Sequence, residues 1–177
     1  MVILGPLIPM LFQGEEWGAS TPFQYFTDHQ EPDLASAVSE GRRREFAAFG
    51  WNPEEIPDPQ DPATFQRSKL DWTEVAREPH KLVLEWYKRL IRLRATTPEL
   101  HDGKFGEIDV DYNEDQHWLM MKRGPITMAI NLGRQKCHVP IPDPGSHRLL
   151  MASDEKIILH AKSAELPSDS VAILGRG

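Results

Sequence analysis

The 177-residue sequence predicts an α+β chain, in which a strand and several helices precede an all-β antiparallel sandwich. Three observations lead to this prediction. A short apolar run, Met10–Phe12, opens into a loop of acids and aromatic residues. Apolar residues recur at three- and four-residue spacing between residues 79 and 94, which indicates an amphipathic helix. From Lys104 onward the apolar period is two, with turn residues between short runs, as in all-β sandwiches or barrels.

The first element expected is a strand at Met10–Gln13, because its continuous apolar run suits a parallel strand buried on both faces. Gly14 ends this run, and the loop that follows ends in Asp28 and His29. Barrel enzymes build substrate sites from such loops at the carboxyl ends of strands. Aromatic faces stack on sugar rings, while carboxylates, amides and imidazole bond their hydroxyls. The alternative is a polar loop that its own aromatic residues pack down.

A helix is expected from about residue 33 to 48. Pro32 suits its first turn, and Gly50 suits a left-handed cap after its end. One face carries the apolar residues Leu34, Ala37, Val38, Phe46 and Phe49. Residues 42–44 are three arginines, which form either an anion site or a solvated face paired with glutamates of the same helix.

The stretch Trp51–Pro62 is too rich in proline for a regular helix or a central strand, so we expect a stiff, extended excursion. A short helical turn follows at Ala63–Arg67. The clearest helix is Pro79–Arg94, and Pro98 lies just beyond its end. Its broad apolar stripe is expected to be core material.

The second part of the chain contains a series of short period-two runs. Pro98–Gly103 is the expected boundary, so the predicted domains are 1–98 and 99–177. The expected strands are Phe105–Tyr112, His117–Lys122, Thr127–Asn131, Lys136–Ile141, His147–Met151, Ile157–Ala161 and Val171–Leu174.

Composition narrows the classes of partner. Twenty basic and 27 acidic residues give a formal charge of −7, which disfavours nucleic acid and anionic membranes but is compatible with a neutral oligosaccharide. The apolar start, Met1–Phe12, is too short to span a bilayer. A single cysteine, Cys137, rules out an internal disulfide and fits a reducing cytoplasm, so we expect a cytoplasmic protein. The oligomeric state stays open.

Three sequence runs carry a resemblance to a known family: LFQGEEWGASTPFQYFTDH at 11–29, SEGRRREF at 39–46 and PDPQDPATFQRSKLDW at 57–72. Together they resemble the maltooligosyltrehalose trehalohydrolases of the alpha-amylase superfamily, and the resemblance covers nearly the whole chain. It implies that Met10–Gln13 is the last strand of a (β/α)8 barrel. Residues 1–98 would then be the carboxyl-terminal remnant of a TIM-barrel catalytic domain, and 99–177 an amylase-type C-terminal β-sandwich.

The resemblance also implies an activity, namely hydrolysis of the alpha-1,4 bond next to the terminal trehalose of maltooligosyl trehalose, which releases trehalose. The family's catalytic carboxylates would precede Met1, so we assign no catalytic residue here and expect the chain alone to be inactive. Glu15 and Glu16 are adjacent; one is expected to line the site and the other to anchor the loop. The substrate-binding candidates are Gln13, Glu15, Glu16, Trp17, Gln24, Tyr25, Phe26, Asp28, His29 and Trp51, with Asp61 a further outer contact.

Alternatives remain at this stage. Asp28 and His29 could be a loop brace, and Trp51–Pro62 a loop strapped outside the barrel. The parent could be an alpha-glucan branching or debranching enzyme, or the sandwich a separate carbohydrate-binding or structural module.

No cofactor is expected. Cys137 and His138 should point to opposite faces of a strand, which disfavours a nucleophile pair. The seven histidines form neither HxH nor HExxH, so no metal site is predicted, although one could be assembled from distant positions.

Overall fold

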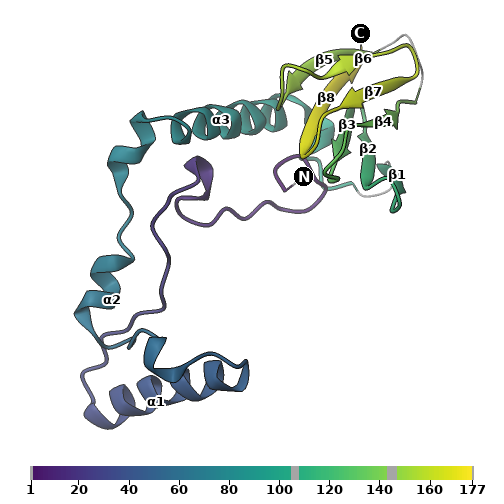
Figure 1. Ribbon diagram of the computed structural model, residues 1–177. Helices are drawn as coiled ribbons and strands as arrows, with labels where there is room; N and C mark the ends of the chain where they lie inside the picture. The colour runs from purple at the N-terminus through teal and green to yellow at the C-terminus, as the bar shows by residue number, and fades with distance from the viewer. Residues whose placement is uncertain (1, 105–107, 143–146, 177) are drawn as a thin grey trace. The chain divides into compact units, whose positions relative to one another are not determined.

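The computed structural model describes residues 2–104, 108–142 and 147–176. Its contacts divide the chain into two compact units. The first, which we call the sandwich unit, comprises residues 1–10 and 90–177; the second, the loop unit, comprises residues 11–89. The long helix α3 (His80–Thr96) contributes residues to both. Figure 1 labels the helices and strands of each unit.

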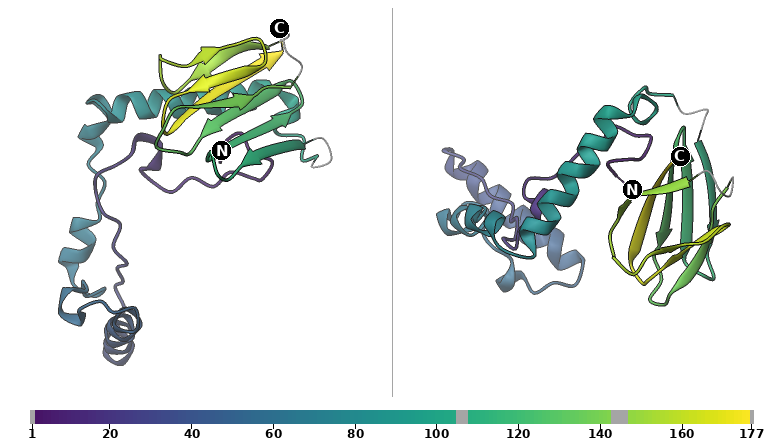
Figure 2. Two further views of the ribbon diagram at one scale, coloured as in Figure 1. Left: turned by 45° about the vertical axis from the view of Figure 1, so that its right-hand side comes forward. Right: turned by 90° about the horizontal axis from the view of Figure 1, so that it is seen from above.

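The sandwich unit consists of two antiparallel sheets (Figure 2). The larger sheet has the strand order β1-β2-β3-β8-β5, and the smaller has the order β4-β7-β6. Their bounds are β1 Ile108–Asn113, β2 Trp118–Arg123, β3 Ile126–Asn131, β4 Cys137–Pro140, β5 His147–Ala152, β6 Ile158–Leu159, β7 Ser163–Leu166 and β8 Ser170–Arg176. Every strand pair is antiparallel, which confirms the predicted sandwich.

One apolar cluster joins the two sheets. Along each strand, alternate side chains point into the space between the layers. The cluster comprises Trp118, Met120, Ala129, Val139, Ile141, Ile157, Ala164, Leu166, Ala172 and Leu174. The central strand β3 is buried along its whole length, which indicates that both faces of the larger sheet are covered.

The first residues of the chain are tied to the sandwich unit by two arginines. Arg94 donates to the carbonyl oxygens of Ile3 at 2.6 Å and Gly5 at 2.8 Å. Arg123, only 2% exposed, donates to the oxygens of Gly5 and Leu100, both at 2.9 Å. Burial and the nearby charge of Arg123 lower the pKa of Arg94.

The strands agree with the sequence prediction, with one omission. All seven predicted strands have a counterpart in the structure. Residues 105–107 of the first predicted strand lie outside the described residues, as do residues 143–146, which precede the fifth. The omitted strand is β7, because Ser163-Ala-Glu-Leu166 is short and carries only two apolar residues. The domain limits 1–98 and 99–177 stay a prediction. The two compact units defined by contacts have different limits.

In the loop unit, the helices lie where the sequence predicts them. They are α1 (Pro32–Ala48), α2 (Pro62–Arg67) and the first residues of α3, with 3-10 turns η1 (Glu15–Trp17), η2 (Pro53–Glu55) and η3 (Trp72–Ala76); a further turn, η4 (Pro98–Leu100), belongs to the sandwich unit. After α1, Gly50 has φ +82°, and Trp51 N–H donates to the Phe46 oxygen at 3.1 Å. This is the expected left-handed cap. Among the described residues, none of the helices has the length and apolarity needed to cross a membrane.

Two local expectations were wrong. Met10–Gln13 forms no strand: Met10 is 86% exposed and Phe12 52% exposed. A strand exists only through hydrogen bonds to neighbouring strands, and none of the strands among the described residues pairs with it. The apolar stripe of α3 is also not core, because no residue of that helix is fully buried and Leu82 is 64% exposed.

Candidate functional site

The loop of residues 14–29 is held in place by its own turn and by side chains from distant segments of the loop unit. Gly14 adopts φ +87°, and a Cβ there would lie 2.8 Å from Ala19 and 2.9 Å from Leu70, so glycine is required. Ala19 N–H donates to the Gly14 oxygen at 2.8 Å, which closes the turn.

Glu74 anchors the next part of this loop. Its carboxylate accepts hydrogen bonds from the backbone N–H of Ser20 at 3.1 Å and from the Ser20 hydroxyl. These hydrogen bonds hold the pKa of Glu74 below its ordinary value. Nδ1 of His80, at the start of α3, lies 3.0 Å from the Trp17 oxygen and 3.1 Å from the Gly18 oxygen. The loop is therefore fixed at several points.

The candidates Glu15, Glu16 and Trp17 lie in the part of this loop that contacts α3. Trp17 is 2% exposed, and its ring lies 4.9 Å from that of Trp72, so its position is that of a packing residue. Glu15 accepts from the Tyr87 hydroxyl at 2.9 Å and from its own loop at Phe12 N–H. Burial first, and then this bond to Glu15, raises the pKa of Tyr87 to about 12. Glu16 is half-buried, and Glu15 has the position of a loop anchor.

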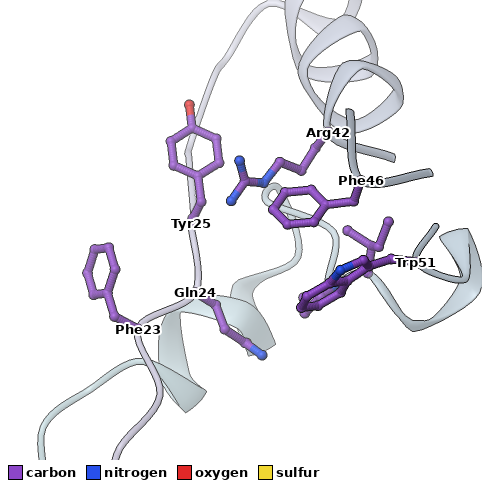
Figure 3. A pocket seen from close by; sticks show the side chains of 8 residues that line it. Phe23, Gln24, Tyr25, Arg42, Phe46 and Trp51 are labelled. Carbon is purple, nitrogen blue, oxygen red and sulfur yellow. The ribbon is translucent and has the colours of Figure 1, made fainter. Parts of the chain in front are cut away.

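A hollow of about 270 Å³ in the loop unit is lined by several aromatic side chains, and we call it the aromatic hollow (Figure 3). The Arg42 guanidinium carbon lies 4.3 Å from the Phe46 ring centre and 5.2 Å from that of Tyr25. Phe46 in turn contacts Trp51, with ring centres 5.3 Å apart. The hollow is lined by Phe23, Gln24, Tyr25, Arg42, Phe46, Trp51, Ile56 and Pro57.

The aromatic hollow brings together three of the sequence candidates. Tyr25 is 46% exposed and Trp51 is 61% exposed, so both rings are open to solvent. Gln24 is oriented by Arg67, whose Nε donates to Oε1 of Gln24 at 3.3 Å. Exposed ring faces beside a guanidinium and an amide offer what a sugar ring needs: an apolar platform and hydrogen-bonding groups at its edge.

Five of the remaining candidates line two other hollows of the loop unit, whereas Glu16, Trp17 and His29 line none of these three hollows. Gln13 and Glu15 lie in one of them, with Gly18, Ala19 and Ser68 among its other residues. Phe26, Asp28 and Asp61 line another, together with Thr27, Gln60, Pro62 and Phe65. The candidates thus spread over three neighbouring stretches of the same unit, and not into one deep pocket.

His29 owes its position to Gln60, a residue that the sequence analysis did not single out. Gln60 Oε1 accepts from the Thr27 hydroxyl at 2.5 Å and from His29 N–H at 3.2 Å, while its Nε2 donates to the His29 oxygen. Asp28 accepts from Gln30 at 2.9 Å. Gln60 therefore braces this part of the loop, and a brace formed by Asp28 with His29 stays a prediction. Sequence alone gave no signal for Gln60, because a lone glutamine in a proline-rich loop has no characteristic pattern.

Arg42 and Phe46 also line the aromatic hollow, although the sequence analysis did not name them as site residues. The arginine run suggested an anion site or a paired helix face, and Arg42 is indeed paired with Glu45 at 3.1 Å. Its stacking on two rings requires α1 to pack beside the Tyr25 segment, which no local pattern encodes.

The candidate carboxylates in the other two hollows, Glu15, Asp28 and Asp61, each accept hydrogen bonds from other groups of the loop unit. Glu15 bonds Tyr87 and Phe12 N–H, and Asp28 bonds Gln30. Asp61 caps α2 by accepting from Ala63 N–H at 2.8 Å. Such carboxylates orient loops and sugar hydroxyls, whereas glycosidic hydrolysis needs a facing pair about 5–5.5 Å apart in retaining enzymes.

Comparison with known proteins gives a consistent result, although no family model matches the chain. The malto-oligosyltrehalose trehalohydrolase of Rhizobium sp. (strain M-11) is 44% identical over 174 residues, which cover 98% of this chain. The enzyme of the same name from Mycobacterium tuberculosis (strain CDC 1551 / Oshkosh) is 46% identical over 169 residues. The chain spans about 29% of the Rhizobium protein and 28% of the Mycobacterium protein.

Solved structures give the same result. The crystal structure of a putative alpha amylase from Salmonella typhimurium matches 99% of this chain with a TM-score of 0.77 at 33% identity, over 29% of that protein. The alpha-amylase from H. orenii matches with a TM-score of 0.57 at 16% identity, which supports the fold alone. The chain therefore belongs to the malto-oligosyltrehalose trehalohydrolase family, within the alpha-amylase type of glycoside hydrolase, and corresponds to less than a third of its relatives' length.

Proposed function

We propose that this chain supplies the outer sugar-binding surface and the sandwich domain of a cytoplasmic enzyme that hydrolyses the alpha-1,4 bond next to the terminal trehalose of maltooligosyl trehalose, releasing trehalose. The observation that carries the proposal is the 44% identity to a trehalohydrolase across 98% of the chain. In this proposal residues 1–98 complete a barrel whose catalytic carboxylates lie in a preceding segment.

The aromatic hollow would hold one glucose unit of the maltooligosaccharide. Trp51 and Tyr25 provide exposed ring faces, and the Arg42 guanidinium and the Gln24 amide provide polar groups next to them. Gln13, Glu15, Glu16, Phe26, Asp28 and His29 would line the path of neighbouring sugar units or hold it in shape. Trp17 is left out of this role because its ring is buried.

The direct test is a chimera in which this chain replaces the matching segment of the Rhizobium trehalohydrolase. The chimera is expected to release trehalose from maltooligosyl trehalose, and the chain alone is expected to release none. A folded chimera that branches or debranches glycogen in preference would overturn the proposed reaction. Trehalose release by the rigorously pure chain would overturn the assignment of catalysis to a preceding segment.

The role of the aromatic hollow is tested in the same chimera. Trp51→Ala is expected to raise KM roughly tenfold, because stacking of an aromatic ring contributes about 0.5–1.5 kcal/mol beyond the buried area itself. Tyr112→Ala is the matched control, since this residue is 61% exposed, belongs to the sandwich unit and does not line the hollow. An unchanged KM for Trp51→Ala would remove the hollow from substrate binding. Titration of the isolated chain with maltooligosaccharides, compared with its Trp51→Ala variant, separates the hollow from the sandwich: heat of binding that is unchanged in Trp51→Ala would favour binding by the sandwich.

A further inference from the structure

Three potential metal ligands converge on the outer face of the smaller sheet. His138 of β4 lies directly opposite Glu165 of β7 in the strand register, and His160 follows β6. The neighbours of these residues along the strands, Val139 and Ala164, are fully buried, so alternation sends His138 and Glu165 to the outer surface. His160 N–H donates to the Ser163 oxygen at 2.8 Å, which fixes the turn that brings it over β7.

The potential ligand atoms of the three side chains lie close to one another. Nε2 of His138 and Nε2 of His160 each lie 3.5 Å from Oε2 of Glu165. The three ligand atoms lie within 4.8 Å of one another, and the imidazole centres are 5.6 Å apart. A separation of 3.5 Å is longer than an ordinary N–H···O hydrogen bond. It is close to the edge of a tetrahedron with metal–ligand arms of 2.0–2.1 Å, which is roughly 3.3 Å.

We propose that His138, His160 and Glu165 form a binding site for a divalent transition-metal ion, zinc in the first instance. Two imidazole nitrogens and one carboxylate oxygen are a ligand set that suits zinc, and three protein ligands leave a fourth position for water. This site lies in the sandwich unit and uses none of the residues assigned to sugar binding.

The surroundings of Glu165 favour its charged, ligating form. Lys136 donates to Oε1 at 2.9 Å, and this bond is the main reason that the pKa of Glu165 lies below its ordinary value. Because Lys136 occupies Oε1, Oε2 is the oxygen that faces both imidazoles. Lys136 is 62% exposed at its side chain and carries a charge that opposes a cation, so it should weaken binding without blocking it.

The proposed ion would join the edges of the smaller sheet. In the order β4-β7-β6, His138 belongs to one edge strand, His160 follows the other, and Glu165 lies on the central strand. A metal bound to all three would link these strands and stabilise the folded sandwich unit by mass action. The simpler alternative is a surface cluster in which Glu165 is only an ion-pair partner of Lys136 and the two histidines.

Calorimetric titration of the complete, tag-free chain with zinc sulfate distinguishes the proposed metal site from a surface cluster of ion pairs. One equivalent of zinc should bind, and His138→Ala, His160→Ala and Glu165→Gln should each weaken binding at least tenfold. Lys136→Met should tighten it severalfold. His101→Ala, which removes an exposed histidine elsewhere, should leave binding unchanged. The same should hold for Cys137→Ser, because Cys137 packs against the core between the sheets.

The thermal midpoint gives a second measurement that does not depend on the heat of binding. Zinc should raise it in the unmodified chain and in His101→Ala, but not in His138→Ala or His160→Ala. The substituted histidines are 57% and 45% exposed at their side chains, so the variants should melt like the unmodified chain when a chelator is present. Absence of zinc binding, or equal loss in His101→Ala and His138→Ala, would overturn the proposal.

Discussion

The sandwich unit and the loop unit are stabilised in different ways. The sandwich unit has a continuous core whose residues, such as Ala129, Val139 and Leu174, are fully buried. In the loop unit the buried apolar side chains among the described residues are only Trp17, Ile56 and Pro59, while many of its aromatic rings are exposed. Its segments are joined mainly by polar bonds such as Ser39 to Asp58 at 2.6 Å. A unit without its own core is what we expect of a barrel remnant that packs on a preceding segment.

The largest expected effect comes from a core substitution in the sandwich unit. Leu166→Ala should cost about 2–5 kcal/mol in free energy of unfolding, since the side chain is fully buried between the sheets. Leu132→Ala, at a position 59% exposed in the same unit, should change it by less than about 0.5 kcal/mol. Hydrogen exchange of the β3 amides measures the free energy of unfolding of both variants. Equal losses in the two variants would contradict a single core between the sheets.

The same comparison predicts a small effect in the loop unit for a residue that looks like core in the sequence. Leu82→Ala removes part of the α3 stripe, but the side chain is 64% exposed, so the loss in the isolated chain should stay below about 0.5 kcal/mol. In the chimera with the Rhizobium segment the loss should rise above about 1 kcal/mol, because a preceding barrel segment would cover the stripe. Thermal melting of both forms measures the difference. An equal, small loss in both would argue against a barrel packed on this face.

Arg123 tests how the start of the chain is attached to the sandwich unit. Arg123→Met should cost about 3 kcal/mol, because it leaves the Leu100 oxygen without a buried donor, removes one of the two arginine donors to the Gly5 oxygen, and leaves Asp102 without its cation. Arg134→Met, at an exposed position, is the control. Urea unfolding gives the free energies, and proteolysis within residues 2–10 should increase in the Arg123 variant alone.

The sequence predicted the structure of the sandwich unit better than the contacts of the loop unit. The strands β3 and β8 pair with each other within this chain, so their period-two patterns were enough to identify them as strands. The sequence of Met10–Gln13 is typical of a buried strand, but a strand needs a hydrogen-bonded neighbour, and no strand in the described part of the chain pairs with it. In the candidate site, exposed aromatic residues such as Tyr25 and Trp51 were found from residue type. Arg42 and Gln60 were not, because their roles depend on contacts between distant segments.

Glu74 predicts a pH dependence confined to the loop unit. Its pKa is lowered in the folded state, so its stabilisation is fully present above the ordinary value of 4.5 and is lost as pH falls through the lowered pKa. Protection of the Ser20 amide from hydrogen exchange should therefore fall several-fold in acid. Glu74→Gln should show reduced protection already at neutral pH and a flatter profile, while Glu54→Gln should behave like the unmodified chain. A Ser20 protection profile that is identical in Glu74→Gln would show that another group anchors the loop.

Two glycine substitutions compare the interior of α1 with the cap that follows its end. Gly41 and Gly50 both have open space where a Cβ would lie, so packing contributes little to either substitution. Gly41→Ala should stabilise by about 0.5–1 kcal/mol, because alanine has the higher helix propensity. Gly50→Ala should destabilise by about 1 kcal/mol, because its φ of +82° is unfavourable for a side chain. Thermal melting followed by helical circular dichroism should show shifts of opposite sign, and shifts of the same sign would mean that the cap after Ala48 is not formed in solution.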